Sequence, residues 1–383
     1  MYEGDHMNKC NNFIIKISSR CNLNCSYCYM FNLGDNTYLQ KPKIMSESVA
    51  LFSLKRIYKY ALKENITEIK IVLHGGEPLL CGYEWIEWFI NSAEALRPKE
   101  VNVRFSLQTN GTLINKQWID FFLKHNISIG VSFDGLRETH DTFRVDHSGR
   151  GSYDKVVNTI KTLSSPEYSK LKWGILVVAN PEYSGEKVYR NLLDLGVKNM
   201  DFLWPEYNND NLPSFNNSLS GYFNEIFDAW FNDRDPCINV RWFKNVIRMI
   251  LSGTTEYDNL GPAPLDEVVI ETDGSIEPLD LLRTCMNGMT RLGLNVKDDD
   301  IENLFRTPLY QVGLNNQNIL PQECKDCSIY QVCGGGYMPH RWKKETGFSN
   351  KSVHCRDLYN TINHIVRVVV AELKKADIEF EVG

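Results

Sequence analysis

Short apolar runs alternate with longer amphipathic stretches over the first half of the chain. Six runs rich in β-branched and aromatic residues have the length and composition of strands: 13–18, 68–73, 102–107, 127–132, 173–178 and 200–204. Between them, apolar residues recur at helical spacing near 46–64, 83–96, 115–125, 153–164 and 185–195. Strands joined by helices over short connections predict a parallel sheet with right-handed crossovers. We therefore predict an α/β fold, an open partial (β/α)6 barrel rather than a closed eight-fold one.

The second half of the chain has a different pattern. Helical spacing of apolar residues predicts further helices at 218–233, 240–252 and 358–373. An Asp-Gly pair between two short apolar runs predicts a hairpin over 268–278. We predict three segments along the chain: a core domain at 10–205, a bridging helical segment at 206–254, and an α+β domain at 255–383.

Composition and charge narrow the possible partners. The 383 residues are 43% apolar, which is enough to bury the cores of two domains. The net charge of −6 comes from interspersed charges of both signs, so we expect no nucleic-acid partner. The apolar runs are too short to span a membrane, and the N-terminus lacks the features of a secretory signal. We expect a cytoplasmic protein with no membrane partner; Met7 is a second possible start, which leaves the origin of residues 1–6 open.

Seven of the eleven cysteines fall into two groups. The groups are Cys21, Cys25 and Cys28, and Cys324, Cys327, Cys333 and Cys355. Since no export signal is present, clustered thiols predict metal ligands rather than a disulfide framework. The four scattered cysteines are expected to be small buried hydrophobic residues: Cys10, Cys81, Cys237 and Cys285.

The first cysteine group follows the first predicted strand with the spacing C-x3-C-x2-C. It offers three thiolates, one fewer than usually hold an iron–sulfur cluster, which would leave one iron open to a further ligand. A zinc site would need a fourth ligand close by, and no Cys or His follows closely. The run Gly75-Gly76-Glu77-Pro78 follows the second predicted strand, so we expect it at the same edge of the sheet. Adjacent glycines allow close approach to the backbone, and a carboxylate can hold an ammonium group.

These two motifs together resemble the signature of the radical S-adenosylmethionine (SAM) superfamily. The resemblance implies a radical SAM core at 10–205, with a [4Fe–4S] cluster on the first cysteine group and SAM chelated to its open iron. The residues implied to lie at the cluster or SAM are Tyr27, Gly75, Gly76, Glu77, Pro78, Ser132 and Arg144. Among these, Ser132 would meet the ribose and Arg144 the carboxylate of SAM. For both, ordinary turn and capping chemistry is the alternative.

The second cysteine group has the spacing C-x2-C-x5-C with a further cysteine downstream. A structural zinc site with four thiolates is one interpretation of this spacing. In a radical SAM chain the pattern resembles the SPASM extension, which implies that 255–383 is a SPASM-like domain holding an auxiliary [4Fe–4S] cluster. A full SPASM domain holds a second auxiliary cluster, but Leu279 and Tyr337 stand where two of its cysteines are expected. We therefore expect two [4Fe–4S] clusters in total, with SAM.

Asp280 follows Leu279 directly and is the candidate catalytic residue. In the sulfatase-maturing relatives of this fold, the aspartate at the matching place acts as a base. The resemblance implies that Asp280 accepts a proton from the substrate once the substrate has been oxidised. A solvated carboxylate after a strand is the alternative.

The run from Cys333 through three glycines to His340, Arg341 and Trp342 resembles one peptide-modifying SPASM branch, whose members form cyclophanes. On this basis we predict a radical SAM oxidoreductase that joins an aromatic ring to a β-carbon in a ribosomally made precursor peptide (a RiPP maturase), with flavodoxin or ferredoxin as reductant. The alternatives are formylglycine formation in sulfatases, thioether crosslinking and, remotely, a non-catalytic metal-binding peptide adaptor. Only about a dozen residues precede the first predicted strand, so we expect no leader-binding winged-helix domain at that end.

Overall fold

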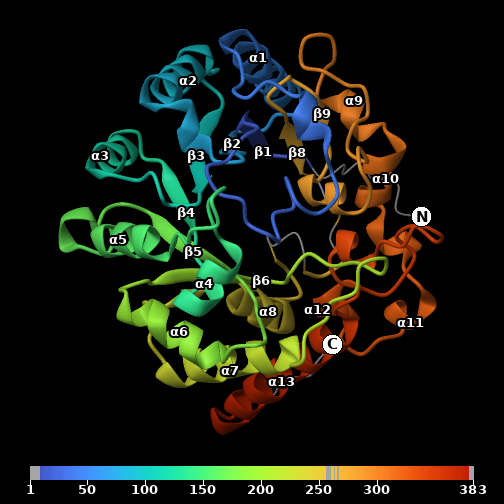
Figure 1. Ribbon diagram of the computed structural model, residues 1–383. Coiled ribbons are helices and arrows are strands. Elements are labelled where there is room, and N and C mark those ends of the chain that lie inside the picture. The colour runs from blue at the N-terminus through green and yellow to red at the C-terminus, as the bar shows by residue number, and fades with distance from the viewer. Residues whose placement is uncertain (1–8, 256–259, 263, 265–266, 379–383) are drawn as a thin grey trace. The chain divides into compact units, whose positions relative to one another are not determined.

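The computed structural model of the chain describes residues 9–255, 260–262, 264 and 267–378 (Figure 1). Residues 1–6, of open origin, lie outside the described residues. The chain forms two compact units whose segments interleave along the sequence. The first comprises Met1–Val131, Arg144–Trp173 and Asp266–Leu314, and the second comprises Ser132–Phe143, Gly174–Leu265 and Asn315–Gly383. The predicted domain bounds near 205 and 255 stay a prediction.

The first unit is built on a mainly parallel sheet. Its strands are β1 (Asn12–Ser18), β2 (Glu68–Gly75), β3 (Asn102–Thr109), β4 (Ser128–Ser132), β8 (Val268–Ile270) and β9 (Ile276–Glu277). β2 and β8 flank β1, β3 pairs with β2 and β4 with β3, all in parallel, while β9 pairs antiparallel with β8. The carboxyl ends of β1, β2 and β3 therefore lie at one edge of the sheet, where ligands bind in such folds.

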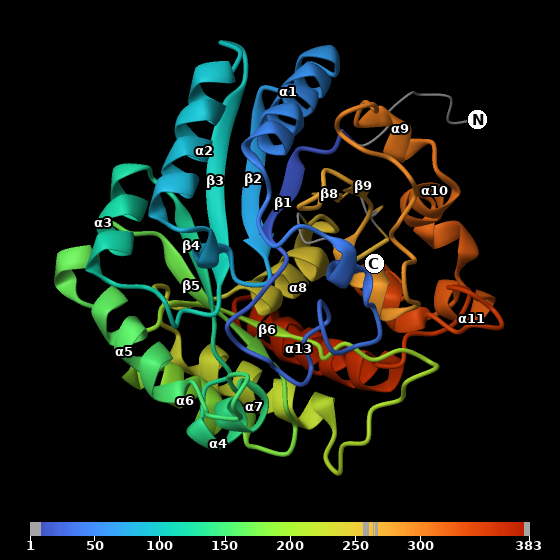
Figure 2. The same cartoon turned by 45° about the horizontal axis from the view of Figure 1, so that its top comes forward.

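Amphipathic helices cover these strands. The helices of the first unit are α1 (Glu47–Lys63), α2 (Tyr83–Leu96), α3 (Lys116–Lys124), α5 (Tyr153–Leu163), α9 (Glu302–Phe305) and α10 (Pro308–Leu314). Figures 1 and 2 show α1, α2 and α3 flanking the strands on one side. Ser46 and Asn115 cap α1 and α3, because their side chains accept hydrogen bonds from the exposed N–H groups of the first turn.

The second unit continues the alternation of strands and helices. Its strands β5 (Trp173–Val178), β6 (Asn199–Leu203) and β7 (Asn239–Val240) are parallel, in that order. Its helices are α4 (Arg137–Phe143), α6 (Gly185–Asp194), α7 (Leu219–Asp233), α8 (Arg241–Ser252), α11 (Gln322–Lys325), α12 (Tyr330–Cys333) and α13 (Cys355–Lys375). Within its core, Trp204 stacks on Phe223 at 4.3 Å between ring centroids, and Trp242 packs against both rings.

The predicted α/β fold class is confirmed, since all six predicted strands and the predicted hairpin are present. The closing helix starts earlier than predicted, at Cys355, because the helix continues into the turn that carries the cysteine. Among the described residues, no helix has both the length and the apolar character needed to cross a membrane.

One prediction about the scattered cysteines is wrong. Cys10 is buried as expected and Cys81 and Cys285 are partly buried, but Cys237 is exposed. Cys237 lies in the turn between α7 and β7, where its backbone N–H donates to the Asp235 carboxylate at 2.8 Å. The turn directs the side chain to solvent, which its residue type alone did not indicate.

Candidate active site

The first cysteine group lies in the loop after β1, in the first unit. The Cys28 N–H donates to the Cys25 carbonyl at 3.0 Å, and the Leu23 N–H donates to the Cys21 Sγ at 3.4 Å. The pKa of the Cys21 thiol is raised to about 12 and that of Cys28 to about 11, mostly by burial and in part by the neighbouring thiols. Three partly buried thiols that affect one another in this way need a cationic partner to become thiolates.

The glycines after β2 are required by the contact with this loop. A Cβ atom on Gly76 would lie 2.2 Å from the Arg20 carbonyl oxygen, and one on Gly75 would lie 2.0 Å from that of Ser18. The cysteine loop lies this close because the Gly76 N–H donates to the Ser18 carbonyl and the Glu77 N–H donates to the Arg20 carbonyl, both at 2.8 Å. The structure thus brings the two predicted motifs together, backbone against backbone.

Glu77 ties the ends of β2 and β3 to each other. It is fully buried, and its Oε1 accepts hydrogen bonds from the Leu79 N–H and the Thr109 hydroxyl at 3.1 and 2.8 Å. Its Oε2 accepts from the Asn110 N–H at 2.8 Å. Burial raises the pKa of Glu77 to about 7, although these three hydrogen bonds oppose the rise. Pro78 begins a short 3-10 helix after this residue.

Asn110 and His147 contact the cysteine loop, although sequence reasoning gave neither a role. The Asn110 Nδ2 lies 3.7 Å from the Cys21 Sγ and donates to the Asn22 amide oxygen at 2.8 Å. The His147 Nε2 lies 3.0 Å from the Cys21 carbonyl oxygen. The position of Asn110 just after β3 was the available signal, whereas His147 comes from a distant segment that no local pattern connects to the loop.

Arg144 and Tyr27 lie beside the same loop. The Arg144 guanidinium lies over the Tyr27 ring, 5.3 Å from its centroid, and Arg144 is buried. The loop is held there by a 2.7 Å hydrogen bond from the Asn24 N–H to the Val145 carbonyl. Ser132 ends β4 and belongs to the second unit.

Asp280 is buried, so the alternative of a solvated carboxylate is wrong. Its Oδ2 pairs with the Lys16 ammonium and accepts a 2.6 Å hydrogen bond from the Tyr29 hydroxyl. The Arg283 Nε lies 2.8 Å from its Oδ1. Burial alone would raise the pKa of Asp280, but the charges of Lys16 and Arg283 outweigh it and hold this pKa well below the usual carboxyl range.

His74 completes this buried cluster, and Lys16 on β1 lies at its centre. The Lys16 Nζ is 3.0 Å from the Tyr29 hydroxyl and 3.2 Å from the His74 Nδ1. Burial and the adjacent Lys16 lower the pKa of His74 to about 3, so this imidazole is neutral. The cluster therefore contains a fixed carboxylate, a fixed ammonium and two neutral polar groups.

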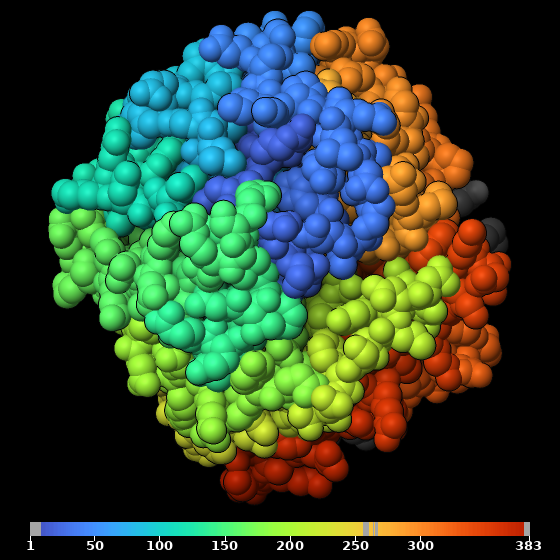
Figure 3. Space-filling model, viewed as in Figure 1, coloured from blue at the N-terminus to red at the C-terminus, as the bar shows by residue number. Residues whose placement is uncertain are grey.

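A second layer of buried charges anchors the hairpin of β8 and β9 and the short 3-10 helix after it, Asp280–Thr284. Arg283 is fully buried, and its guanidinium donates to Glu271 at 2.7 Å and to Asp35 and Glu277 at 3.2 Å each. Lys41 donates to Glu277 at 2.7 Å. Figure 3 shows the blue surface of the segment after β1 beside the orange surface of the segment after β9. These ion pairs fix Asp280 against the segment that follows the cysteine loop.

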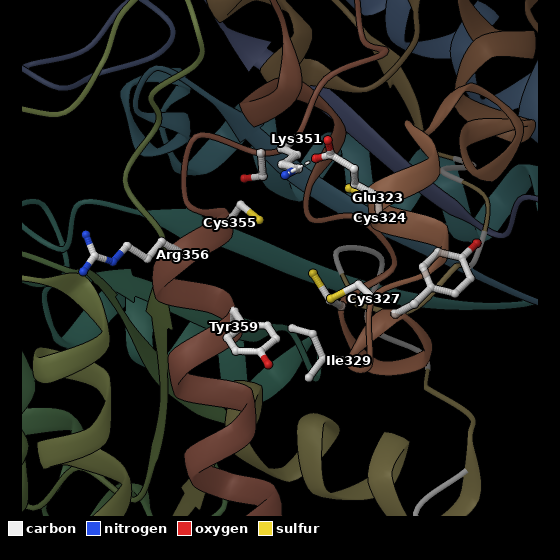
Figure 4. Close-up of a pocket in the computed structure, with 12 residues that line it drawn as sticks. Glu323, Cys324, Cys327, Ile329, Lys351, Cys355, Arg356 and Tyr359 are labelled. Atoms are coloured by element: carbon white, nitrogen blue, oxygen red, sulfur yellow. Dashed lines mark ion pairs between the residues drawn. The ribbon is translucent and has the colours of Figure 1, made fainter.

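The four cysteines of the second group line one cavity of about 460 Å³ in the second unit. Cys324 lies on α11, Cys333 ends α12 and Cys355 begins α13, while Cys327 lies between the two short helices (Figure 4). The pKa of the Cys333 thiol is raised to about 12, mostly by burial and in part by the other three thiols. Four sulfur donors around one cavity match the ligand chemistry of an iron–sulfur cluster or of zinc.

No group of three or more His, Cys, Asp or Glu side chains within the described part of the chain is arranged to hold a metal ion directly.

The glycine run after Cys333 is explained by packing. All three glycines have positive φ angles, and a Cβ atom on Gly334 would lie 1.7 Å from the Gly261 carbonyl oxygen. His340 and Arg341 are buried, and the His340 Nε2 lies 3.0 Å from the Glu206 carboxylate. Gly335 lines the cysteine cavity, while His340 and Arg341 are buried residues of the same unit, so packing alone accounts for this run and it carries no information on the product of a reaction.

Comparison with known proteins defines the class. Residues 15–199 match the model of the radical SAM superfamily, so the chain contains a radical SAM domain. It is 29% identical over 348 residues to a cysteine-type anaerobic sulfatase-maturating enzyme of Clostridium novyi, covering 87% of this chain and 88% of that enzyme. A serine-type enzyme of Klebsiella aerogenes is 27% identical over 333 residues, covering 85% and 78% of the two chains. The chain is thus homologous to anaerobic sulfatase-maturating enzymes.

The solved structures agree with this relationship. The structure of anSMEcpe with bound AdoMet is similar at a TM-score of 0.82 and 26% identity, covering 95% of this chain and 99% of that one. The same protein with AdoMet and a Cp18Cys peptide gives a TM-score of 0.81.

The predicted cyclophane-forming function is wrong. The relatives that match this chain over most of its length include sulfatase-maturating enzymes of the cysteine and serine types. The prediction rested on the glycine run and the His340-Arg341 pair, which the structure explains as close packing around the second cysteine cavity.

Proposed function

We propose that this protein is a radical SAM maturase that oxidises the side chain of a Cys or Ser residue in a protein or peptide substrate to formylglycine. The observation that carries the proposal is the similarity to sulfatase-maturating enzymes over 87% of the chain. The close contact between the first cysteine loop and the glycines after β2 adds support, because it joins the two motifs that the chemistry requires.

We propose that Cys21, Cys25 and Cys28 hold a [4Fe–4S] cluster. The fit rests on three partly buried thiols from a single loop, with cationic Arg144 lowering the pKa of Cys28. Such a cluster with bound SAM supplies a 5′-deoxyadenosyl radical, which removes a hydrogen atom from an unactivated carbon. The protein supplies the thiolates, the placement of the substrate and the exclusion of water.

The remaining candidate residues have separate roles in the proposal. Gly75 and Gly76 let the end of β2 pack directly against the backbone of the cysteine loop, beside which SAM would lie, and Pro78 begins the short helix that follows. Since Glu77 already accepts three hydrogen bonds from the protein, we propose that it fixes this backbone instead of binding the SAM amino group itself. Ser132 remains the proposed contact of the SAM ribose, and Arg144 of its carboxylate.

Asp280 is the proposed proton acceptor. Oxidation of the Ser side chain to an aldehyde removes a hydrogen atom from Cβ, an electron and a proton, and the proton needs a base near the substrate carbon. The same losses from Cys give a thioaldehyde, which water then converts to the aldehyde with release of hydrogen sulfide. Asp280 is ionised at every ordinary pH because of Lys16 and Arg283, and the Tyr29 hydroxyl fixes its Oδ2. Asp280 therefore presents a carboxylate of fixed orientation but low basicity, which accepts a proton only after oxidation has made the substrate strongly acidic.

The four cysteines of the second group are the proposed ligands of an auxiliary [4Fe–4S] cluster, which makes two clusters in total. The fit rests on four thiols that line one cavity. A cluster there would supply an electron acceptor for the oxidised substrate.

The test uses the anaerobically reconstituted full chain with SAM, a strong reductant and two synthetic peptides. The peptides contain the segment around the residue that is modified in a sulfatase, one with Cys and one with Ser. Formation of 5′-deoxyadenosine together with a peptide of the mass of the aldehyde is expected from at least one peptide. The control is the Cys21/Cys25/Cys28→Ala variant, which should yield neither product.

Other results would contradict the proposal. A product that has lost two hydrogens and kept its sulfur would indicate thioether formation. Failure to cleave SAM under strong reductant would favour a non-catalytic adaptor.

A further inference from the structure

Arg341 is a buried cation without a carboxylate partner among the described residues. It ends the short 3-10 helix Met338–Arg341 in the second unit and has no solvent exposure. Its Nη2 donates to the side-chain oxygen of the buried Asn316. Within the described residues, its Nε and Nη1 have no hydrogen-bond partner. Because a buried guanidinium without a counter-charge is strongly destabilising, these two atoms require a negative group.

The thiols of the second cysteine group are close enough to act electrostatically on Arg341. Burial lowers the pKa of Arg341 to about 10, and ionised Cys324 and Cys333 oppose this by favouring the charged form. The residue before Arg341 lies against the cavity wall, because the His340 carbonyl accepts a 2.9 Å hydrogen bond from the Val353 N–H, which follows the cavity-lining Ser352 and stands two residues before Cys355. The unpaired guanidinium thus lies within electrostatic range of Cys324 and Cys333, two of the proposed cluster ligands.

We propose that Arg341 is the charge partner of the auxiliary cluster and sets its reduction potential. This inference rests on the proposed function, which puts a [4Fe–4S] cluster on the four cysteines. Such a cluster with four thiolates has a net negative charge that increases by one on reduction, so an adjacent buried cation stabilises the reduced form more than the oxidised form. Arg341 therefore raises the potential and favours electron transfer to this cluster.

Asn316 is the positioning residue for this cation. The side-chain oxygen of Asn316 accepts a hydrogen bond from the Nη2 of Arg341, which leaves the Nε and Nη1 N–H groups available as donors to a ligand. A planar guanidinium held in this way can donate N–H groups to cluster sulfur atoms, and hydrogen bonds to sulfur also raise the potential of such clusters.

The experiment measures the auxiliary cluster alone. The full chain carries Cys21/Cys25/Cys28→Ala, so that only the second cysteine group can hold iron, and the midpoint potential is determined by an EPR-monitored redox titration after anaerobic reconstitution. Arg341→Gln, which removes the charge, should lower the midpoint potential. Arg341→Lys, which keeps the charge, should remain closer to the parent protein.

Arg356→Gln is the matched control. Arg356 lines the same cavity but is exposed, and Figure 4 shows its guanidinium directed away from the cysteines. Because water screens an exposed charge, its removal should leave the potential close to that of the parent.

The outcomes separate this inference from the function on which it rests. Zinc in place of iron on the second cysteine group of the parent protein would overturn the proposal of an auxiliary cluster, and the proposed role of Arg341 with it. An intact cluster with equal potentials in the parent, Arg341→Gln and Arg356→Gln proteins would overturn the role of Arg341 alone. If Arg341→Gln takes up no iron, the Arg341→Lys variant decides the question. A midpoint potential close to that of the parent would support the charge role of Arg341. Loss of the cluster in Arg341→Lys as well would mean that Arg341 serves packing, and it would overturn the charge role.

Discussion

At the scale of single residues, Lys16 shows how the candidate site is organised. A lysine in the middle of β1 is fully buried because three polar groups from other parts of the first unit surround its ammonium. Burial and the charge of Lys16 together keep His74 neutral, and the charges of Lys16 and Arg283 together keep Asp280 ionised. One buried cation thus helps to fix the protonation state of two neighbours.

Replacing Lys16 by Met should leave the Asp280 carboxylate buried beside one cation fewer. We expect the free energy of unfolding, measured by urea denaturation at neutral pH, to fall by about 3–5 kcal/mol, as when one partner of a buried pair is removed. The control is Lys59→Met, since Lys59 pairs with Asp300 at the surface and its side chain is 58% exposed. That change should stay within about 0.5 kcal/mol of the parent. Equal losses in both variants would refute the importance of the buried pair.

Glu77 leads to a prediction about pH. Its pKa rises from the model-compound value of 4.5 to about 7 on folding, because of burial. The folded state therefore binds this proton more tightly than the unfolded state, and stability is lost as the pH rises from about 4.5 to about 7. The loss from this residue is at most about 3 kcal/mol.

The measurement compares urea denaturation of the parent and Glu77→Gln proteins at several pH values. Glu77→Gln should be destabilised by about 1–3 kcal/mol, because its amide nitrogen would face a backbone donor such as the Asn110 N–H. It should also lose the part of the pH slope that comes from Glu77. An unchanged slope would show that Glu77 does not titrate in this range.

At the scale of elements, the contact between the end of β2 and the cysteine loop is a backbone contact that no side chain can adjust. The Gly76 and Glu77 N–H groups donate to carbonyls on either side of Ser19. Loop and strand therefore move as one body, and the geometry of the three thiols depends on two glycines.

The Gly76→Ala substitution should push the cysteine loop away from the end of β2. Its Cβ atom would lie 2.2 Å from the Arg20 carbonyl oxygen, so the loop must shift. We expect selective loss of the iron bound by the first cysteine group after reconstitution, with the second group unaffected, as measured by iron analysis and EPR.

Gly221→Ala is the control for an added methyl group. Gly221 lies in α7, and its Cβ would come no closer than 3.1 Å, to the Ser218 hydroxyl. This variant should keep its iron. Full iron content in Gly76→Ala would show that the loop tolerates the shift.

The elements were also the most predictable part of the molecule. The strand pattern located β1 to β6 because β-branched runs bounded by turns carry their own signal. The cysteine and glycine motifs could be found for the same reason, since each lies within a few residues. The pairing of Lys16 with Asp280 could not be found, because the two residues are 264 positions apart and each reads locally as an ordinary charged residue. His147 was missed for this reason too, whereas Asn110 had an available signal in its position just after β3.

The wrong prediction of product has a different cause. The glycine run after Cys333 is a true local signal, but its physical meaning is close packing against the Gly261 backbone. A motif fixed by packing recurs wherever the same cavity is built, whatever the reaction. Resemblance in such a motif therefore indicates the cavity and not the product.

At the scale of the whole molecule, the proposal implies two clusters in one chain. We expect about eight irons per chain after anaerobic reconstitution and about four in the Cys21/Cys25/Cys28→Ala variant, measured with acid-labile sulfide. A matched variant, Cys10→Ala, changes a buried cysteine outside both groups and should keep all its iron. About four irons and one zinc in the parent protein would mean that the second group is a structural zinc site.

The interleaving of the first unit has a consequence for its synthesis. β1 leaves the ribosome long before β8, its neighbour in the sheet, and Lys16 is made 264 residues before the Asp280 carboxylate that neutralises it. At about 5–20 residues per second, that interval lasts tens of seconds. Through that time the nascent first unit has an unpaired lysine in its central strand and one side of that strand uncovered. Its final closure therefore waits for residues 266–314, which makes the N-terminal part of the nascent chain a natural client for chaperones.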